Sequence, residues 1–201
     1  VVIVQDGPLG GDCTFTGCVP SKALLAAAAR GNSFDEAMER VHAAVDHIAA
    51  TEDAAALARE GIDVIAGFAR FRNPASIDVD GTTVRSKRFI VATGARPLIP
   101  AIPGLRESDP MTNESLFQLD ERPTSLAILG GGPIGCEMAQ AFARLGSRVT
   151  LIEAEDRLLP REEPDASAVI ADVLARDGVT VRAGSKATLV ERSPDGKICV
   201  H

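Results

Sequence analysis

The sequence has 201 residues, 45% of them hydrophobic and 24% charged, and a formal net charge of -7. This acidic balance argues against nucleic-acid binding, and no apolar run approaches the roughly 18 residues that a membrane-spanning helix needs. The first residues lack the charged and apolar regions of a secretion signal, so we expect a cytoplasmic protein in a reducing compartment. Its four cysteines do not have the spacing of a zinc site, and we predict no metal centre.

The first half of the sequence predicts a strand, a glycine-rich loop, two helices and several short strands. Val1–Val4 is an apolar strand, and Gly7–Gly17 is the glycine-rich loop. Helices are predicted over Cys18–Arg30 and Phe34–Arg59, the second because its apolar residues recur three and four positions apart. Further strands are expected at Ile62–Phe71, Ser76–Val79, Thr82–Arg85 and Phe89–Ala92, with Asp80-Gly81 as a hairpin turn and a proline-rich linker afterwards.

A second unit of alternating strands and helices begins near Pro123. Its predicted elements are strands at Leu126–Leu129, Arg148–Glu153, Thr180–Ala183 and Ala187–Glu191, helices at Pro133–Leu145 and Ala166–Arg176, and a last strand after the turn Pro194-Asp195-Gly196. Alternation of strands and helices with short loops predicts parallel sheets and an α/β fold.

Two cysteines five positions apart stand where the first helix begins. Cys18 opens the helix, and Lys22 lies one turn later on the same face. The helix dipole and the lysine both favour a thiolate, so we expect a lowered pKa for Cys18. Cys13 and Cys18 can form a disulfide within the loop, but two unrelated core cysteines would have the same spacing. The pair alone leaves both interpretations open.

The segment Leu126–Gly135 is a strand that runs into G-x-G-x-x-G and then a helix. In a dinucleotide site Gly130 permits the tight turn, Gly132 lets a pyrophosphate approach the backbone, and Gly135 allows close helix–strand packing. The helix N-terminus offers free amides and partial positive charge to the phosphates. The alternative is a glycine-rich turn without a ligand, but the complete strand–turn–helix context favours the nucleotide.

The next strand ends in Glu153, 21 residues after the middle glycine (153 − 132 = 21), where a ligand for a ribose 2′-hydroxyl is expected. A carboxylate repels a 2′-phosphate, so Glu153 favours NAD over NADP. Arg157, four residues later, would weaken this preference.

Three segments in order resemble the class I pyridine nucleotide–disulfide oxidoreductases, the family of dihydrolipoamide dehydrogenase, glutathione reductase and mercuric reductase. Gly10–Lys22 is similar to that family's active-site pattern G-G-T-C-x-N-x-G-C-x-P-[SK]-K. Phe89–Pro97 is similar to the A-T-G-x-x-P segment that follows the small β-meander of its FAD domain. Gly130–Glu137 matches its NAD(P)H site, and the resemblance covers essentially all 201 residues.

The resemblance implies two Rossmann-like domains, both incomplete: an FAD domain with a β-meander at 1–115 and an NAD(P) domain at 116–201. It implies FAD and NAD as cofactors, with NADP as the less favoured alternative. The cofactor-binding residues carried over from the family's motifs are Gln5, Gly11, Asp12, Lys22, Thr93, Gly94, Gly130, Gly132, Pro133, Ile134, Gly135 and Glu153.

The resemblance also implies the chemistry: hydride passes from NAD(P)H to FAD, and the reduced flavin opens a Cys13–Cys18 disulfide. By its position Cys18 would be the flavin-side thiolate and Cys13 the thiol that meets the substrate. Lys22 and Glu137 match a family pair that meets beside the flavin, and these four residues are the catalytic candidates. Either charged residue is also typical of an exposed helix surface.

Departures from the family pattern bear on the substrate. Asp12 stands where threonine is usual, Phe15 where asparagine is common, and Gln5 where a carboxylate normally binds the FAD ribose. They favour a mercuric-reductase-like branch, with a small or protein-bound disulfide or mercuric ion as substrate. The alternatives are dihydrolipoamide dehydrogenase and, from another class, a non-catalytic nucleotide-binding or redox-sensing fragment.

A complete family member also has an earlier FAD glycine motif, a late FAD segment and a C-terminal dimerisation domain with a His-Glu pair. We therefore expect this chain to be part of a longer, homodimeric protein or a degenerate gene product. Alone, it should bind FAD poorly and turn over little.

Overall fold

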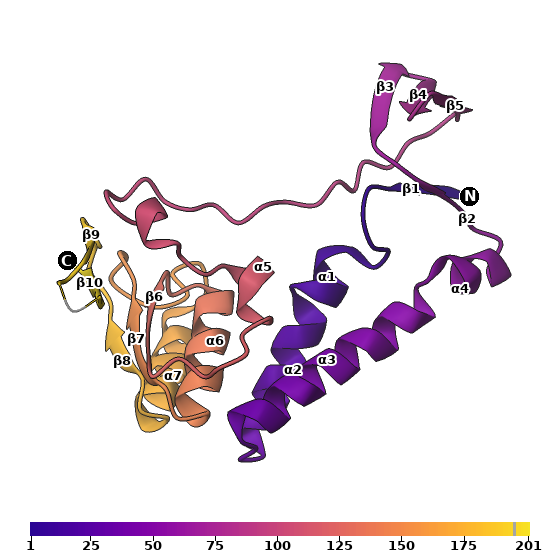
Figure 1. The fold of residues 1–201 in the computed structure, drawn as a ribbon. Coiled ribbons are helices and arrows are strands. Elements are labelled where there is room, and N and C mark those ends of the chain that lie inside the picture. Colours follow the sequence, from indigo (N-terminus) through magenta and orange to yellow (C-terminus); the bar gives the residue numbers. More distant parts are fainter. Residues whose placement is uncertain (195) are drawn as a thin grey trace.

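The computed structural model describes residues 1–194 and 196–201 and has an α/β architecture, as predicted (Figure 1). Asp195, in the predicted turn at 194–196, lies outside the described residues. Within the described part of the chain, no helix combines the length and apolar character needed to cross a membrane.

The chain begins with a two-stranded parallel sheet and a group of helices. Strand β1 (Val2–Gln5) pairs with β2 (Asp63–Ala66), so that Val2 lies opposite Asp63. Between these strands run α1 (Gly11–Phe15), α2 (Cys18–Ala29), α3 (Phe34–Thr51) and α4 (Ala54–Arg59). The pairing confirms the parallel arrangement expected for this segment.

The single helix predicted over Phe34–Arg59 is wrong, because the helix is interrupted after Thr51. The Asp53 side chain accepts a hydrogen bond of 2.7 Å from the amide of Ala56 and so caps a new helix, α4. Aspartate competes with the helical backbone in this way and favours cap positions over helix interiors. The alanine-rich composition on both sides of the break favours helix and therefore concealed it.

An antiparallel meander follows, made of β3 (Ala69–Asn73), β4 (Ser76–Val79) and β5 (Thr82–Arg85). The strand predicted at Ile62–Phe71 is in fact two, β2 and β3, because Gly67 turns the chain with a φ of 143°. Asp80 and Gly81 both have positive φ, as expected for the tight hairpin turn between β4 and β5.

The strand predicted at Phe89–Ala92 does not form. This apolar segment is extended, and the side chain of Ile90 is 93% exposed. Among the described residues no strand pairs with it, and a β-strand needs backbone partners as well as apolar side chains. Figure 1 shows the segment crossing from β5 towards η1 (Arg106–Ser108) and α5 (Asn113–Leu116), two short helices that the sequence did not predict.

The second half contains a parallel sheet in the order β6-β7-β8, which confirms the predicted parallel pairing. Two helices connect its successive strands, and an antiparallel pair of strands follows at the C-terminal end. The elements are β6 (Ser125–Leu129), α6 (Pro133–Arg144), β7 (Arg148–Ile152), α7 (Pro164–Arg176), β8 (Thr180–Arg182), β9 (Val190–Arg192) and β10 (Ile198–Val200).

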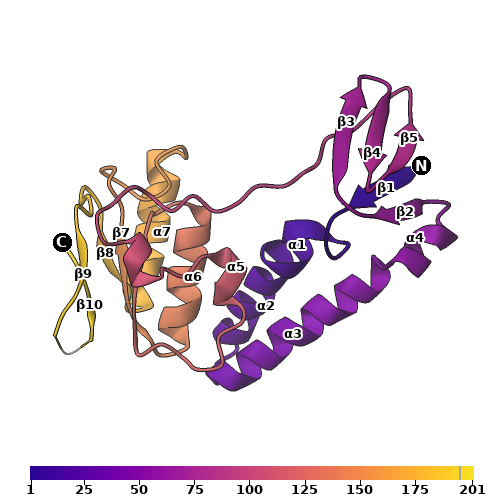
Figure 2. The same cartoon turned by 45° about the horizontal axis from the view of Figure 1, so that its top comes forward.

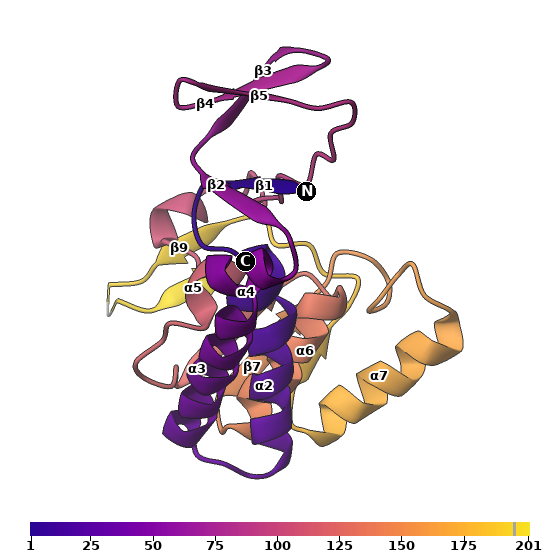
Figure 3. The ribbon, with the colours of Figure 1, turned by 90° about the vertical axis from the view of Figure 1, so that its right-hand side faces the viewer.

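One hydrophobic core joins the two halves. Helices α2 and α3 pack together, and α2 also packs against α6, as Figures 1 and 3 show. The rings of Phe34 and Phe142 lie 6.3 Å apart across this junction, and Phe142 is fully buried. The same core includes Leu24 of α2 and Leu151 of β7. It therefore fixes the start of α2 relative to the start of α6, and both helix starts carry predicted site residues.

Candidate redox and nucleotide site

Cys13 and Cys18 lie on two successive helices, and both are free, exposed thiols. The expected loop at Gly7–Gly17 is wrong in part, because residues Gly11–Phe15 form the short helix α1, which carries Cys13. The amide of Thr16 donates to the carbonyl of Asp12 over 2.9 Å and closes this helix. Cys18 is the first residue of α2, as predicted.

Cys13 has the largest influence on the pKa of the Cys18 thiol. Hydrogen bonding with Cys13 and the charge of Cys13, followed by loss of hydration, raise the pKa of Cys18 above its ordinary value. Lys22 and a backbone hydrogen bond lower the pKa, but they do not reverse the shift. The expected lowering of the Cys18 pKa is therefore wrong for the dithiol, since the adjacent sulfur outweighs the lysine and the helix end.

Lys22 and Glu137 meet across the junction between the two halves. The Lys22 Nζ atom donates to both carboxylate oxygens of Glu137, at 2.6 and 2.9 Å. Lys22 comes from α2, one turn after Cys18, and Glu137 comes from the first half of α6. The structure thus brings together two catalytic candidates that are 115 positions apart.

A second long-range contact, which the sequence did not predict, holds α1. The hydroxyl of Thr14 donates to the Glu52 carboxylate over 2.7 Å, and Thr14 is only 2% exposed. Glu52 directly follows α3. The two residues are 38 positions apart and belong to no common motif, so no local signal in the sequence could have paired them.

Asp12 and Gly94, two predicted flavin-binding residues, also lie close together. A Cβ atom at Gly94 would stand 3.2 Å from a carboxylate oxygen of Asp12, and Gly94 has a φ of +70°. Nothing lies within 4 Å of the corresponding position at Gly11, so its backbone is open to a ligand. Thr93 is exposed in the extended segment, and Gln5 ends β1.

The glycine turn between β6 and α6 has the geometry that a dinucleotide site requires. Gly130 has a φ of +110°, which favours glycine. A side chain at Gly135 would overlap the carbonyl oxygen of Gly130, so the helix can approach the strand only because Gly135 has none. No atom lies within 4 Å of a Cβ placed at Gly132, which leaves the space for a phosphate open. Pro133 and Ile134 are the first residues of α6.

Glu153 contacts this turn directly, because its carboxylate accepts hydrogen bonds from the amides of Gly131 and Glu155, at 2.6 and 2.8 Å. Arg157 donates instead to the carbonyl oxygens of Pro160 and Glu162, at 2.9 and 3.1 Å. The guanidinium of Arg157 is therefore engaged with its own loop, while the carboxylate of Glu153 lies at the glycine turn.

The remaining cysteine near the site is unsuited to thiol chemistry. Cys136 is buried on α6, and its thiol donates to the carbonyl of Gly131 over 3.4 Å. Burial, together with the charges of Glu153 and Glu137, raises its pKa to about 11. Among residues 1–194 and 196–201, no three histidine, cysteine, aspartate or glutamate side chains are grouped as metal ligands would be.

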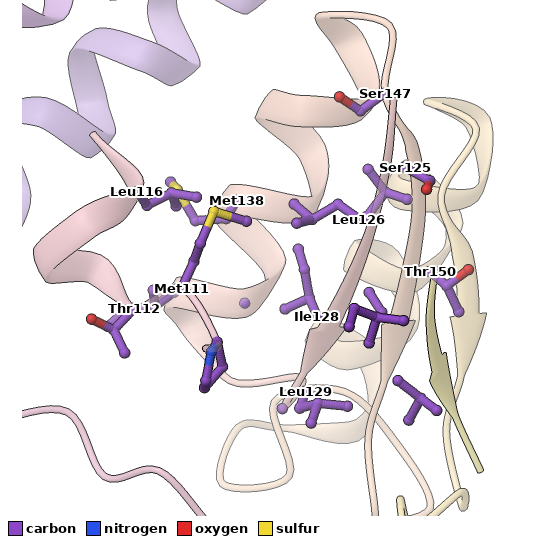
Figure 4. A pocket seen from close by; sticks show the side chains of 18 of the residues that line it. Met111, Thr112, Leu116, Ser125, Leu126, Ile128, Leu129, Met138, Ser147 and Thr150 are labelled. Carbon is purple, nitrogen blue, oxygen red and sulfur yellow. The ribbon is translucent and has the colours of Figure 1, made fainter. Parts of the chain in front are cut away.

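A cavity of about 1240 Å³ runs along β6 and reaches the glycine turn. Figure 4 shows Leu126, Ile128 and Leu129 of β6 on one side of it, with Met111 and Met138 on the other. Neither redox cysteine lines this cavity. It is therefore adjacent to the nucleotide turn and separate from the thiols.

The linker also touches the redox segment. The side-chain amide of Asn113, at the start of α5, donates to the carbonyl of Thr16 over 3.1 Å. Thr16 lies two residues before Cys18, so the linker holds the chain between the two cysteines. Like the Thr14 contact, this one joins distant residues, and no sequence pattern indicated it.

Comparison with known proteins agrees with these features. The model of the pyridine nucleotide-disulphide oxidoreductase family matches residues 1–200. A mercuric reductase of Streptomyces lividans is 38% identical over 98% of this chain and 46% of its own length. A dihydrolipoyl dehydrogenase of Thermus scotoductus is 32% identical over 98% of this chain and 46% of its own length.

Among solved structures, the Cu(II) complex of the HOCl-induced flavoprotein disulfide reductase RclA from Escherichia coli has a TM-score of 0.89 and 32% sequence identity. The match covers all of this chain and 47% of RclA. This chain spans 34% of a mercuric reductase of Bacillus cereus and 46% of that of Streptomyces lividans, less than half of either. All these relatives are oxidoreductases.

Proposed function

Because the chain belongs to the pyridine nucleotide-disulphide oxidoreductase family, we propose that the whole protein moves electrons from NADH through FAD to the Cys13–Cys18 pair. The observation that carries this proposal is the ion pair between Lys22 and Glu137. It joins the helix that starts at Cys18 to the helix that starts at the glycine turn. Electron transfer between bound groups requires that they be held in one arrangement, and this contact together with the shared core supports such an arrangement.

Residues 1–115 would form the FAD domain, with Gln5, Gly11, Asp12, Lys22, Thr93 and Gly94 as its contacts. The open backbone at Gly11 and the close approach of Asp12 to Gly94 fit a bound group that lies along the start of α1. A carboxylate accepts hydrogen bonds from hydroxyls and repels phosphates, so Asp12 would face the sugar or ribityl hydroxyls. Bound FAD supplies the two-electron relay between nicotinamide and thiols.

Residues 116–201 would form the NAD domain. The open space at Gly132 and the amides at the start of α6, which include those of Ile134 and Gly135, fit a pyrophosphate. Glu153 would accept a hydrogen bond from the ribose 2′-hydroxyl. Arg157 donates to two carbonyl oxygens of its own loop, which leaves fewer of its N–H groups for a 2′-phosphate. This arrangement supports NAD rather than NADP.

The two thiols would have unequal roles. In the dithiol, Cys13 raises the pKa of Cys18, while Lys22 lowers it and so favours loss of the proton. Lys22 would therefore stabilise a Cys18 thiolate once Cys13 reacts elsewhere. Cys13 is exposed on α1 and would exchange with the substrate.

We propose a disulfide or mercuric ion as the final acceptor, since relatives at 35 to 38% identity are mercuric reductases. Dihydrolipoamide is the alternative, favoured by the relative at 32% identity. The whole protein would act as a homodimer in the cytoplasm.

An anaerobic titration of the FAD-loaded whole protein with NADH tests the proposal. A long-wavelength thiolate–flavin absorption band should appear and should be lost in Cys18→Ser. Cys136→Ser is the matched control and should keep the band, because Cys136 is buried and its pKa is about 11. Flavin reduction without such a band in the unaltered protein would overturn the role proposed for the cysteine pair.

A further inference from the structure

Helix α1, which carries Cys13, is too short to hold its own shape. It has five residues, and its N-cap residue, Gly10, provides no side-chain hydrogen bond. Isolated helices shorter than about 12 residues are marginal in water. The position of Cys13 must therefore depend on contacts between α1 and the rest of the molecule.

The contact that the structure offers is the hydrogen bond from Thr14 to Glu52. Thr14 is the buried residue of α1, and its hydroxyl lies 2.7 Å from the carboxylate. A hydrogen bond to an ionised acceptor is roughly twice as strong as a neutral one. A carboxylate at a helix C-terminus is disfavoured by the helix dipole, so the helical position alone does not account for Glu52.

Helix α3 gives Glu52 a firm attachment. The helix has 18 residues, begins with a capping box formed by Ser33 and Glu36, packs on α2, and contributes Phe34 and Val41 to the hydrophobic core. Figure 2 shows α3 running alongside α2 towards α1. Glu52 therefore connects α1 to a part of the molecule that the core already fixes.

The same contact requires a glycine at position 10. A Cβ atom at this position would lie 2.6 Å from the Glu52 carboxylate and 2.8 Å from the Thr14 hydroxyl. Its φ of +108° is also one that other residues rarely adopt. The backbone at Gly10 thus leaves room for the bond between Thr14 and Glu52.

We propose that Glu52 is a positioning residue for the redox pair: by binding Thr14, it holds α1 so that the Cys13 thiol stays beside Cys18. This inference rests on the proposed function, because it assumes that the two cysteines form a disulfide. The two sulfur atoms must come within about 2.05 Å for that bond, so the placement of α1 affects how readily the bond forms.

The equilibrium between the full chain and glutathione measures this effect without flavin. The two thiols react with oxidised glutathione to give the Cys13–Cys18 disulfide and two molecules of reduced glutathione. One S–S bond breaks and one forms, while two electrons and two protons pass to glutathione. Mass spectrometry after acid quenching and alkylation gives the fraction of disulfide.

Loss of the contact should make the disulfide harder to form. Glu52→Ala and Thr14→Val should each lower the equilibrium constant about tenfold, the effect of one hydrogen bond with a charged partner. Glu52→Gln should fall between Glu52→Ala and the unaltered chain, and Thr14→Ser should match the unaltered chain because it keeps the hydroxyl. The double variant should be no worse than either single one.

Glu60→Ala is the matched control, since Glu60 is an exposed glutamate at the C-cap of the neighbouring helix α4. It should leave the equilibrium unchanged. Circular dichroism identifies variants that fail to fold, and the conservative Glu52→Gln and Thr14→Ser then decide the question. A disulfide equilibrium unchanged in Glu52→Gln and Glu52→Ala would overturn the positioning role. Failure of the unaltered chain to form the disulfide would instead overturn the proposed function.

Discussion

Two opposing influences act on the Cys18 thiol. Cys13 raises its pKa through a hydrogen bond and through its charge, whereas Lys22 lowers it. Because these side chains are all exposed or near the surface, the balance depends on their immediate geometry more than on burial. The state of Cys13 therefore controls how acidic Cys18 is.

Replacing Cys13 with alanine should lower the pKa of Cys18, because the two largest causes of its raised value disappear. Iodoacetamide reacts with the thiolate, so alkylation of Cys18 should begin at lower pH in Cys13→Ala than in the unaltered chain. Lys22→Met should shift the profile the opposite way. Mass spectrometry of the Cys18 peptide gives the rate at each pH. A Cys13→Ala profile shifted to higher pH would contradict this account.

Glu153 provides a second prediction about a single residue. Glu153→Gln should weaken NADH binding about tenfold, or about 1.4 kcal/mol, because an uncharged amide accepts a weaker hydrogen bond. It should weaken NADPH binding less, so the preference for NADH narrows. Fluorescence titration of both nucleotides measures this. Glu155→Gln, an exposed neighbour, is the control, and equal losses for the two nucleotides would argue against contact with the ribose.

For single residues, the sequence predicts site residues that belong to a local motif. It does not predict contacts between residues that only the fold brings together. The positions of Cys18, Lys22 and Glu137 could be predicted because each belongs to a local pattern. Thr14 and Glu52 could not, since their hydrogen bond exists only once α3 has brought residue 52 beside α1. The raised pKa of Cys18 was missed for a related reason: it depends on how α1 places Cys13.

At the scale of elements, two glycines of the turn between β6 and α6 have different roles. Gly135 is needed for the packing of the helix on the strand, and Gly132 for the proposed nucleotide binding. Gly135→Ala should destabilise the chain by more than about 2 kcal/mol, because its methyl group would overlap the carbonyl of Gly130. Gly132→Ala should leave stability nearly unchanged, since its surroundings are open and its φ of -73° suits any residue. It should nevertheless weaken NADH binding, because the methyl group would occupy the space proposed for the phosphate.

Urea unfolding followed by circular dichroism gives the stabilities, and nucleotide titration gives the affinities. A Gly132→Ala variant that binds NADH as tightly as the unaltered chain would show that the phosphate does not approach there. Comparable stability of both variants would contradict the packing role of Gly135.

Elements that form through local signals were predicted well, and those that depend on partners were not. Helix α2, helix α6 and the parallel strands follow from apolar periodicity and glycine turns. The apolar run Phe89–Ala92 has the composition of a strand, yet it stays extended without a partner among the described residues. The break before α4 arises from one side chain, Asp53, that caps a new helix.

On the scale of the whole molecule, one hydrophobic core holds the first half of the chain, with the cysteine pair, against the second half, with the glycine turn. Phe142→Ala should destabilise the chain by about 3–5 kcal/mol, because Phe142 is fully buried and packs near Phe34 across the junction. Val169→Ala, at a position 60% exposed, is the control and should have little effect. Urea unfolding measures both, and an unaffected Phe142→Ala variant would show that the halves do not depend on this core.

The junction also explains why Lys22 and Glu137 meet. Their ion pair is partly exposed and alone would contribute little to stability. The packing of α2 on α6 holds the two side chains in place. The ion pair therefore matters for its position, because it links the helix that begins at Cys18 to the helix that begins at the glycine turn. The family resemblance implied that the two residues meet, and the packing of α2 on α6 brings them into contact.

Trapping the cysteines after reduction by NADH tests directly whether electrons reach the Cys13–Cys18 pair. The FAD-loaded whole protein, with its disulfide first oxidised, is mixed anaerobically with a stoichiometric amount of NADH and then alkylated. Mass spectrometry should find Cys13 and Cys18 alkylated together after NADH and protected before it. A flavin that becomes reduced while the Cys13–Cys18 disulfide stays intact would contradict the account.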